Sequence, residues 1–140
     1  MKKIFVLISI TSLFFACIKE DPITISNFSI FNQSTNKITV ISYSNKNVMY
    51  DSMLIKPNEN FVISENLEEG LRFQLGEMNR AIILFNDTVF YTVYRDSLSK
   101  LPSGNILKLE DWSGGKIDEY HYEYEFSFTE ADYLEALKHQ

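Results

Sequence analysis

Apolar and polar residues alternate along much of the chain after residue 22, with the period of two that is typical of a β-strand. The clearest case is segment 116–128, in which aromatic side chains would share one face and mainly acidic ones the other. The aromatic set is Tyr120, Tyr122, Tyr124, Phe126 and Phe128, and the polar set is Glu119, His121, Glu123 and Glu125. Such alternation favours a strand with one packed and one solvent-facing side. We therefore expect 116–128 to be the longest strand of a sheet.

Shorter strands are expected where β-branched and aromatic residues run between turn signals. They are 23–30, 38–44, 48–56, 61–67, 71–75 and 106–109. In the first of these, the apolar residues change parity after Ile25, which predicts a bulge or bend near Asn27. Loops are expected at 32–36 and 98–105, and turns at 45–47, 57–58 and 111–115. The last turn would carry Trp112, the only tryptophan.

Segment 81–85 is strongly apolar and does not alternate, which favours a strand buried on both faces. Asn86 and Asp87 tolerate turn geometry. We therefore expect 81–85 and 88–94 to form a hairpin at the centre of the sheet, and one long strand is the alternative.

The chain is expected to end in a short helix over 130–138. Thr129 resembles an N-cap, and Asp132 lies three residues later, as in a capping box. Tyr133, Leu134 and Leu137 would pack against the sheet. Strands at regular spacing followed by one helix predict a mainly β fold, an antiparallel β-sandwich (Ig-like or related), for a single domain over 23–140.

The first 16 residues have the pattern of a secretory signal peptide. Lys2 and Lys3 precede an apolar run over 4–15, which ends at the small residue Ala16. A membrane-spanning helix needs roughly 20 apolar residues, and this run is shorter. We expect residues 1–16 to be removed, which makes Cys17 the new first residue.

Residues 13–17 resemble a bacterial lipobox, and the resemblance implies that Cys17 carries a lipid. Two or three acyl chains would hold the protein stably at a membrane, with 17–22 as anchor and linker. The alternative for this sole cysteine is a buried core thiol. Lys19, Glu20 and Asp21 are similar to the surface-export signal of lipoproteins of the Bacteroidota, and an ordinary charged linker is the alternative. The resemblance to small surface lipoproteins implies a lipid-anchored outer-membrane protein that faces the cell surface or, alternatively, the periplasm.

Charge excludes one class of partner. Removal of residues 1–16 takes away two lysines and no acid, which leaves 11 basic and 19 acidic side chains, a formal charge of −8. A surface of this sign repels phosphate backbones, so we expect no binding to nucleic acid.

No catalytic residue, metal ligand set or cofactor motif is expected. His121 and its neighbouring glutamates would lie about 6.6–6.8 Å apart along the strand, too far apart to bind one metal ion unless another strand contributes, so a solvated acidic face is favoured. With Cys17 lipidated, a disulfide or a cysteine metal site is excluded. A carboxylate pair of the glycosidase kind depends on spatial separation, which the sequence does not define.

Two further kinds of site are candidates. Trp112 would bind a ligand such as a sugar if its indole is exposed, and a core position is the alternative. Ser52, Thr88 and Ser97 each follow an aspartate and precede an aliphatic residue or methionine, a triplet that resembles the O-glycosylation site of exported Bacteroidota proteins. Ordinary polar positions at strand ends are the alternative.

The expected function is a non-catalytic, lipid-anchored binding or accessory protein that engages a partner protein or a glycan. A structural envelope lipoprotein without a ligand is the second hypothesis, and a small hydrolase is the third.

Overall fold

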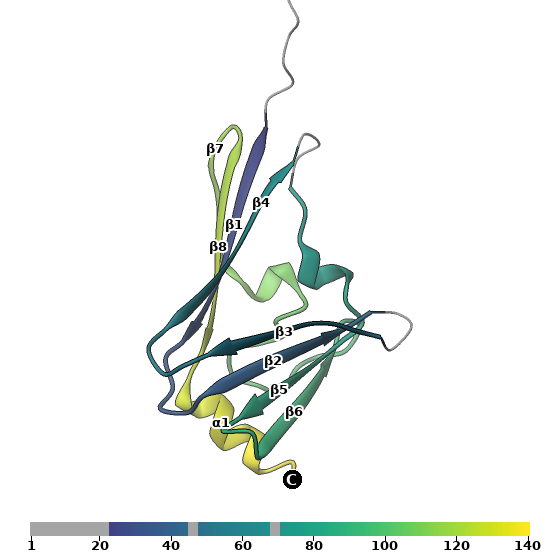
Figure 1. The fold of residues 1–140 in the computed structure, drawn as a ribbon, viewed down its shortest axis with the longest axis vertical. Helices are drawn as coiled ribbons and strands as arrows, with labels where there is room; N and C mark the ends of the chain where they lie inside the picture. Colours follow the sequence, from purple (N-terminus) through teal and green to yellow (C-terminus); the bar gives the residue numbers. More distant parts are fainter. Residues whose placement is uncertain (1–22, 45–47, 68–70) are drawn as a thin grey trace, which may run out of the picture.

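Alternating burial organises the fold into two sheets, as Figure 1 shows for the computed structural model, which describes residues 23–44, 48–67 and 71–140. Sheet A has the strand order β4-β1-β8-β7, and sheet B the order β3-β2-β5-β6. The strands are β1 Thr24–Asn32, β2 Ile38–Tyr43, β3 Met49–Ile55, β4 Asn60–Leu67, β5 Arg80–Phe85, β6 Val89–Tyr94, β7 Ser113–Asp118 and β8 His121–Phe128. The expected β-sandwich with one C-terminal helix is confirmed. One pairing in sheet A is not antiparallel, since β1 and β8 run parallel.

The core lies between the two sheets and is rich in aromatic rings. Phe28 of β1 stacks on Tyr124 of β8 with ring centroids 5.5 Å apart, and it meets Trp112 edge-on at 5.8 Å. Phe85 of β5 contacts Phe128 of β8 across the sandwich at 6.4 Å. Edge-to-face and offset pairs of this kind add to the stabilisation that apolar burial supplies.

Strand β1 is regular, and the bulge predicted near Asn27 is wrong. Its inward residues are Thr24, Ser26, Phe28, Ile30 and Asn32, and its register with β4 and β8 is unbroken. The parity of the apolar residues changes because Ile23 and Ile25 point outward while Thr24 and Ser26 are buried. In Figure 1, this end of sheet A extends past sheet B.

Segment 116–128 is two strands, not one. β7 and β8 form a hairpin whose turn is Glu119 and Tyr120, and their register shifts between Lys116 and Asp118. Tyr122, Tyr124, Phe126 and Phe128 do share the inner face, but Tyr120 lies in the turn. β7 starts at Ser113, so the turn predicted at 111–115 is also wrong. Glycine is typical of turns, so Gly114 does not indicate a strand in the sequence. In the structure Gly114 has a φ of 110° and lies close to β8, where a Cβ would be 2.2 Å from the Glu123 carbonyl oxygen.

Two predicted strands are short 3₁₀ helices and loops. Residues 71–75 lead into η1 (Gln74–Glu77), and 106–109 lead into η2 (Leu109–Asp111). Leu75, Ile106 and Leu107 are nevertheless buried, and Leu71, Phe73 and Leu109 are half-buried against the core. These segments therefore supply core side chains without pairing as strands in the described residues.

The hairpin of β5 and β6 is confirmed, with left-handed φ values at Asn86 and Asp87 (49° and 60°). β5 alternates between buried and half-buried residues, so it is not fully buried on both faces. β6 lies at the edge of sheet B, so only β5 of this hairpin is central. The predicted turn at Pro57 and Asn58 and the loops at 32–36 and 98–105 are also confirmed; the predicted turn at 45–47 lies outside the described residues.

Helix α1 (Glu130–Leu137) begins with the predicted capping box. The Thr129 backbone N–H donates to the Asp132 carboxylate at 2.7 Å, and the Ser103 N–H donates to the same side chain at 2.9 Å. Because Asp132 must reach both donors, the helix turns Asp132 and Ala136 inward and leaves Leu134 and Leu137 exposed. Of the three apolar residues predicted to face the sheet, only Tyr133 packs on the core.

Candidate functional site

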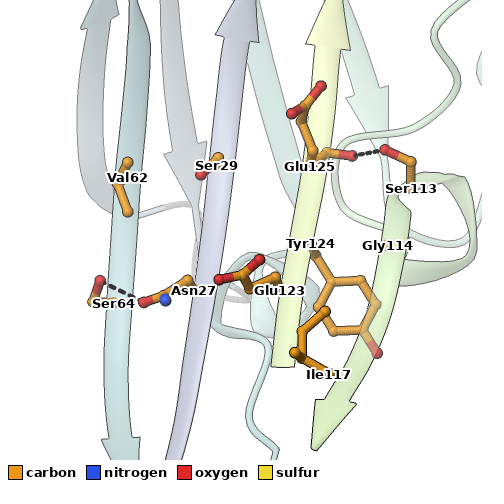
Figure 2. A pocket seen from close by; sticks show the side chains of 10 residues that line it. All are labelled: Asn27, Ser29, Val62, Ser64, Ser113, Gly114, Ile117, Glu123, Tyr124 and Glu125. Atoms are coloured by element: carbon orange, nitrogen blue, oxygen red, sulfur yellow. Dashed lines mark hydrogen bonds between the residues drawn. The ribbon is translucent and has the colours of Figure 1, made fainter. Parts of the chain in front are cut away.

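A groove of about 560 Å³ lies on the outer face of sheet A (Figure 2). All four strands of the sheet contribute to it. Its lining is mainly hydroxyl, amide and carboxylate, with Val62 and Ile117 as aliphatic walls. The polar residues are Asn27, Ser29, Ser64, Ser113, Glu123 and Glu125. Their outward orientation follows from the strand period, because their neighbours along β1 and β8 fill the core.

Strand pairing arranges the polar residues of the groove in two rows across the sheet. One row runs Ser64, Asn27, Glu123 and Gly115, and the other runs Val62, Ser29, Glu125 and Ser113. Neighbouring strands lie about 4.8 Å apart, so each row presents side chains at that spacing. Serine and glycine are small, and the surface is therefore hollow between the larger side chains.

The first row is linked by side-chain contacts. The Ser64 hydroxyl donates to the Asn27 amide oxygen at 2.8 Å, which orients the amide nitrogen toward His121. That nitrogen lies 3.4 Å from His121 Nε2, and the Glu123 carboxylate lies 3.3 Å from the same Nε2. An Nε2 without a hydrogen accepts from Asn27, whereas an Nε2 that carries a hydrogen donates to Glu123. The tautomer of His121 therefore determines which of the two contacts is a hydrogen bond.

The second row is fixed by serines. Ser113 donates to the Glu125 backbone carbonyl at 3.1 Å, and Ser127 donates to the Glu125 carboxylate at 3.0 Å. Neither Ser64 nor Ser113 donates to an imidazole, so neither is arranged as a nucleophile with an adjacent base. The expected shared face of His121, Glu123 and Glu125 is confirmed, and Glu119 lies apart from it in the turn. In the described part of the chain, no group of three or more His, Cys, Asp and Glu side chains is placed to hold a metal ion.

Trp112 does not line the groove. Its side chain is 6% exposed, its indole N–H donates to the Ile106 carbonyl at 3.0 Å, and Phe73 and Phe126 contact its ring at 5.3 and 5.4 Å. The exposed indole that sugar stacking requires is therefore not present, and the core position is observed. Of the two positions that the sequence left open for Trp112, the structure has the core position.

The triplet residues Ser52, Thr88 and Ser97 are all exposed. Thr88 is the last residue of the hairpin turn, in which the Asp87 carboxylate forms an ion pair with Lys37. Their modification remains a prediction. Cys17, Lys19, Glu20 and Asp21 lie outside the described residues, so lipidation and surface export also remain predictions.

A buried acid that the sequence analysis missed lies on the inner face of β4. Glu65 is 8% exposed and pairs in register with Ser26 of β1. Burial raises the pKa of Glu65, and the charge of Arg72 acts in the opposite direction. Within the described ranges, both Glu65 carboxyl oxygens and the Ser26 hydroxyl are without hydrogen-bond partners. The signal in the sequence was a polar residue at an inward position of an alternating strand.

A second, smaller pocket of about 210 Å³ opens between β3, β4 and η1. Its floor is apolar, with Met53, Phe61 and Leu75, and its rim carries Tyr50 and Asp51.

No described helix is long and apolar enough to cross a membrane. The chain matches no protein-family model, no curated protein and no solved structure.

Proposed function

We propose that the mature chain is a lipid-anchored, non-catalytic binding protein of the outer membrane, which engages a glycan through the groove on the outer face of sheet A. The observation that carries this proposal is the double row of hydroxyl, amide and carboxylate groups across four strands. The lipid on Cys17 would keep the domain at the membrane, and the groove would give it a ligand.

The chemistry of the groove matches a hydroxyl-rich ligand. Glu123 and Glu125 accept hydrogen bonds from sugar hydroxyls, Asn27 donates through its amide, and serine hydroxyls do both. Val62 is placed to pack against the C–H face of a sugar ring. The two carboxylates disfavour an anionic ligand, so a neutral or amino-bearing glycan fits best.

The test starts from the native protein, purified from its membrane in mild detergent and applied to an array of neutral, amino and acidic glycans. We expect binding to neutral or amino glycans, and a loss of ten-fold or more in affinity for Glu123→Gln. Glu59→Gln, which removes an exposed acid from the turn between β3 and β4, is the matched control and should bind normally.

Other results would favour the other hypotheses. Cleavage of a bound glycan would indicate a hydrolase that uses the Glu123 and Glu125 carboxylates. A protein that co-purifies reproducibly, without glycan binding, would indicate an accessory subunit. If neither a ligand nor a partner is recovered, a structural envelope lipoprotein is favoured. The buried Trp112 is consistent with that role.

A further inference from the structure

Exposed apolar side chains gather at the end of sheet A where the chain enters the fold. Ile25 belongs to the outer face of β1, and Ile23 directly precedes that strand; Ile117 belongs to β7, and Tyr120 to the turn between β7 and β8. We call these four residues the tip. Their exposed fractions lie between 39% and 59%. Figure 1 shows this end of the sheet extended beyond sheet B.

Backbone pairing holds the tip together. The Ile25 N–H donates to the Tyr120 carbonyl at 2.8 Å, and Ile25 is in register with His121 of β8. Ile117 precedes Asp118, which also pairs with His121. Ile25, Ile117 and Tyr120 are thus carried by one paired region of the sheet, and Ile23 directly precedes it.

The pattern at the tip is reversed relative to a packed strand. The inward residues Thr24 and Ser26 are polar, whereas the outward residues Ile23 and Ile25 are apolar. Apolar residues on the outer face gain free energy only when something covers them. The reversal therefore points to an apolar environment outside the domain.

The position of the tip identifies that environment. If Cys17 carries a lipid, the six residues 17–22 separate the lipid from Ile23, and six residues span at most about 20 Å. The tip is then the part of the described domain held nearest to the bilayer. We propose that the tip rests in the headgroup layer of a neutral phospholipid membrane and orients the domain, an inference that rests on the proposed lipid anchor.

The charges at the tip favour a neutral lipid surface over an anionic one. Asp118 and Glu119 directly precede Tyr120, and Lys116 lies two residues before Asp118. Two acids and one base do not favour an anionic surface. Addition of anionic lipid is therefore expected to leave the contact unchanged or weaken it, whereas a basic membrane-binding patch would respond in the opposite way.

A second exposed apolar patch supplies the control. Phe90 of β6 and Leu134 and Leu137 of α1 are also exposed, and Figure 1 places α1 at the end of the molecule opposite to the entry of the chain. Leu134 is 53% exposed, comparable to the tip residues. If exposure of apolar groups alone decided membrane contact, both patches would insert equally.

The test uses single cysteines, because a lipidated Cys17 cannot react with a thiol probe. Full-length lipoprotein with Tyr120→Cys or Leu134→Cys is labelled with an environment-sensitive fluorophore and reconstituted into phosphatidylcholine vesicles. We expect the label at 120 to be blue-shifted and at least three-fold better protected from iodide than the label at 134. Equal protection of the two labels would overturn the proposal.

Two further measurements separate the possible failures. Ile23→Thr with Ile25→Thr, combined with Tyr120→Cys, should keep the protein on the vesicles but reduce protection at 120 to the value at 134; unchanged protection would overturn the role of the isoleucines. Leu134→Thr with Leu137→Thr should have no effect on the label at 120. If the thiol probe labels Cys17 of the unsubstituted protein and the protein does not float with vesicles, Cys17 is not lipidated. The proposed membrane contact is then also wrong, whereas the proposed glycan binding by the groove is unaffected.

Discussion

The two halves of β1 follow the same strand geometry but opposite chemistry. In the half opposite sheet B, Phe28 and Ile30 point inward and are almost completely buried. In the half that extends past sheet B, Thr24 and Ser26 point inward, and Ile25 and the preceding Ile23 are exposed on the other side. The strand period determines which residues share a face, but what covers each face determines its chemistry. A change of parity in a sequence can therefore mark the limit of the partner sheet without any bulge.

The largest difference in unfolding free energy is expected between Phe28→Ala and Ile25→Ala. Phe28 contacts Tyr124, Phe73 and Trp112, so its truncation removes buried area and leaves a cavity that costs about 3–5 kcal/mol of unfolding free energy. Ile25 is exposed, so Ile25→Ala should lower the unfolding free energy by less than about 1 kcal/mol. Urea denaturation of the detergent-solubilised protein measures both values, and similar losses at the two sites would contradict the distinction between the halves.

A smaller effect, which depends on pH, is expected at Glu65. Burial raises the pKa of Glu65 in the folded protein above its ordinary value of 4.5, although the Arg72 charge opposes the change. The folded state then binds the proton more tightly than the unfolded state, so stability falls as pH rises from the ordinary pKa through the raised one. Glu65→Gln removes this cost and should be more stable than the native protein at pH 7.

The same comparison at low pH is the control for Glu65. Below about pH 4 the native carboxyl is protonated in both states, so the advantage of Glu65→Gln should disappear. Glu59→Gln, at an exposed site, should show no such change between pH 4 and pH 7. Thermal unfolding across this range gives the measurement, and an advantage that grows toward low pH would show that the carboxylate is stabilised in the fold.

The smallest effect is expected for Ser26→Ala, directly opposite Glu65. The Ser26 hydroxyl is buried and has no hydrogen-bond partner among the described residues, so its removal relieves a desolvation cost. We expect an unchanged or slightly higher unfolding free energy, with a gain below about 1 kcal/mol. A clear loss of stability in urea would reveal a partner that the hydroxyl requires.

Features set by local chemistry could be predicted from the sequence. The hairpin turn at Asn86 and Asp87, the capping box of Thr129 and Asp132, and the alternation over 121–128 depend on residues close in the chain, and the structure confirms each. The burial of Trp112 and the exposure of Leu134 depend on contacts with distant segments, which a local pattern does not contain.

Only part of the groove could be predicted, because the rest depends on contacts between segments that are distant in the sequence. The outward face of β8 with His121, Glu123 and Glu125 followed from alternation. The contribution of Asn27, Ser29 and Ser64 required the order β4-β1-β8-β7, in which strands far apart in the sequence become neighbours. A parallel pairing between the first and last strands has no signal in a single sequence.

That pairing of β1 with β8 affects how the domain is made. Asn27 and His121 touch although they are 94 positions apart, so the two central strands of sheet A are the first and the last to leave the ribosome. Sheet A cannot close until the C-terminal strand is available, and contacts so distant in sequence form slowly. A nascent chain that lacks residues 121–140 should therefore remain open and sensitive to protease, even though every strand of sheet B has already been synthesised.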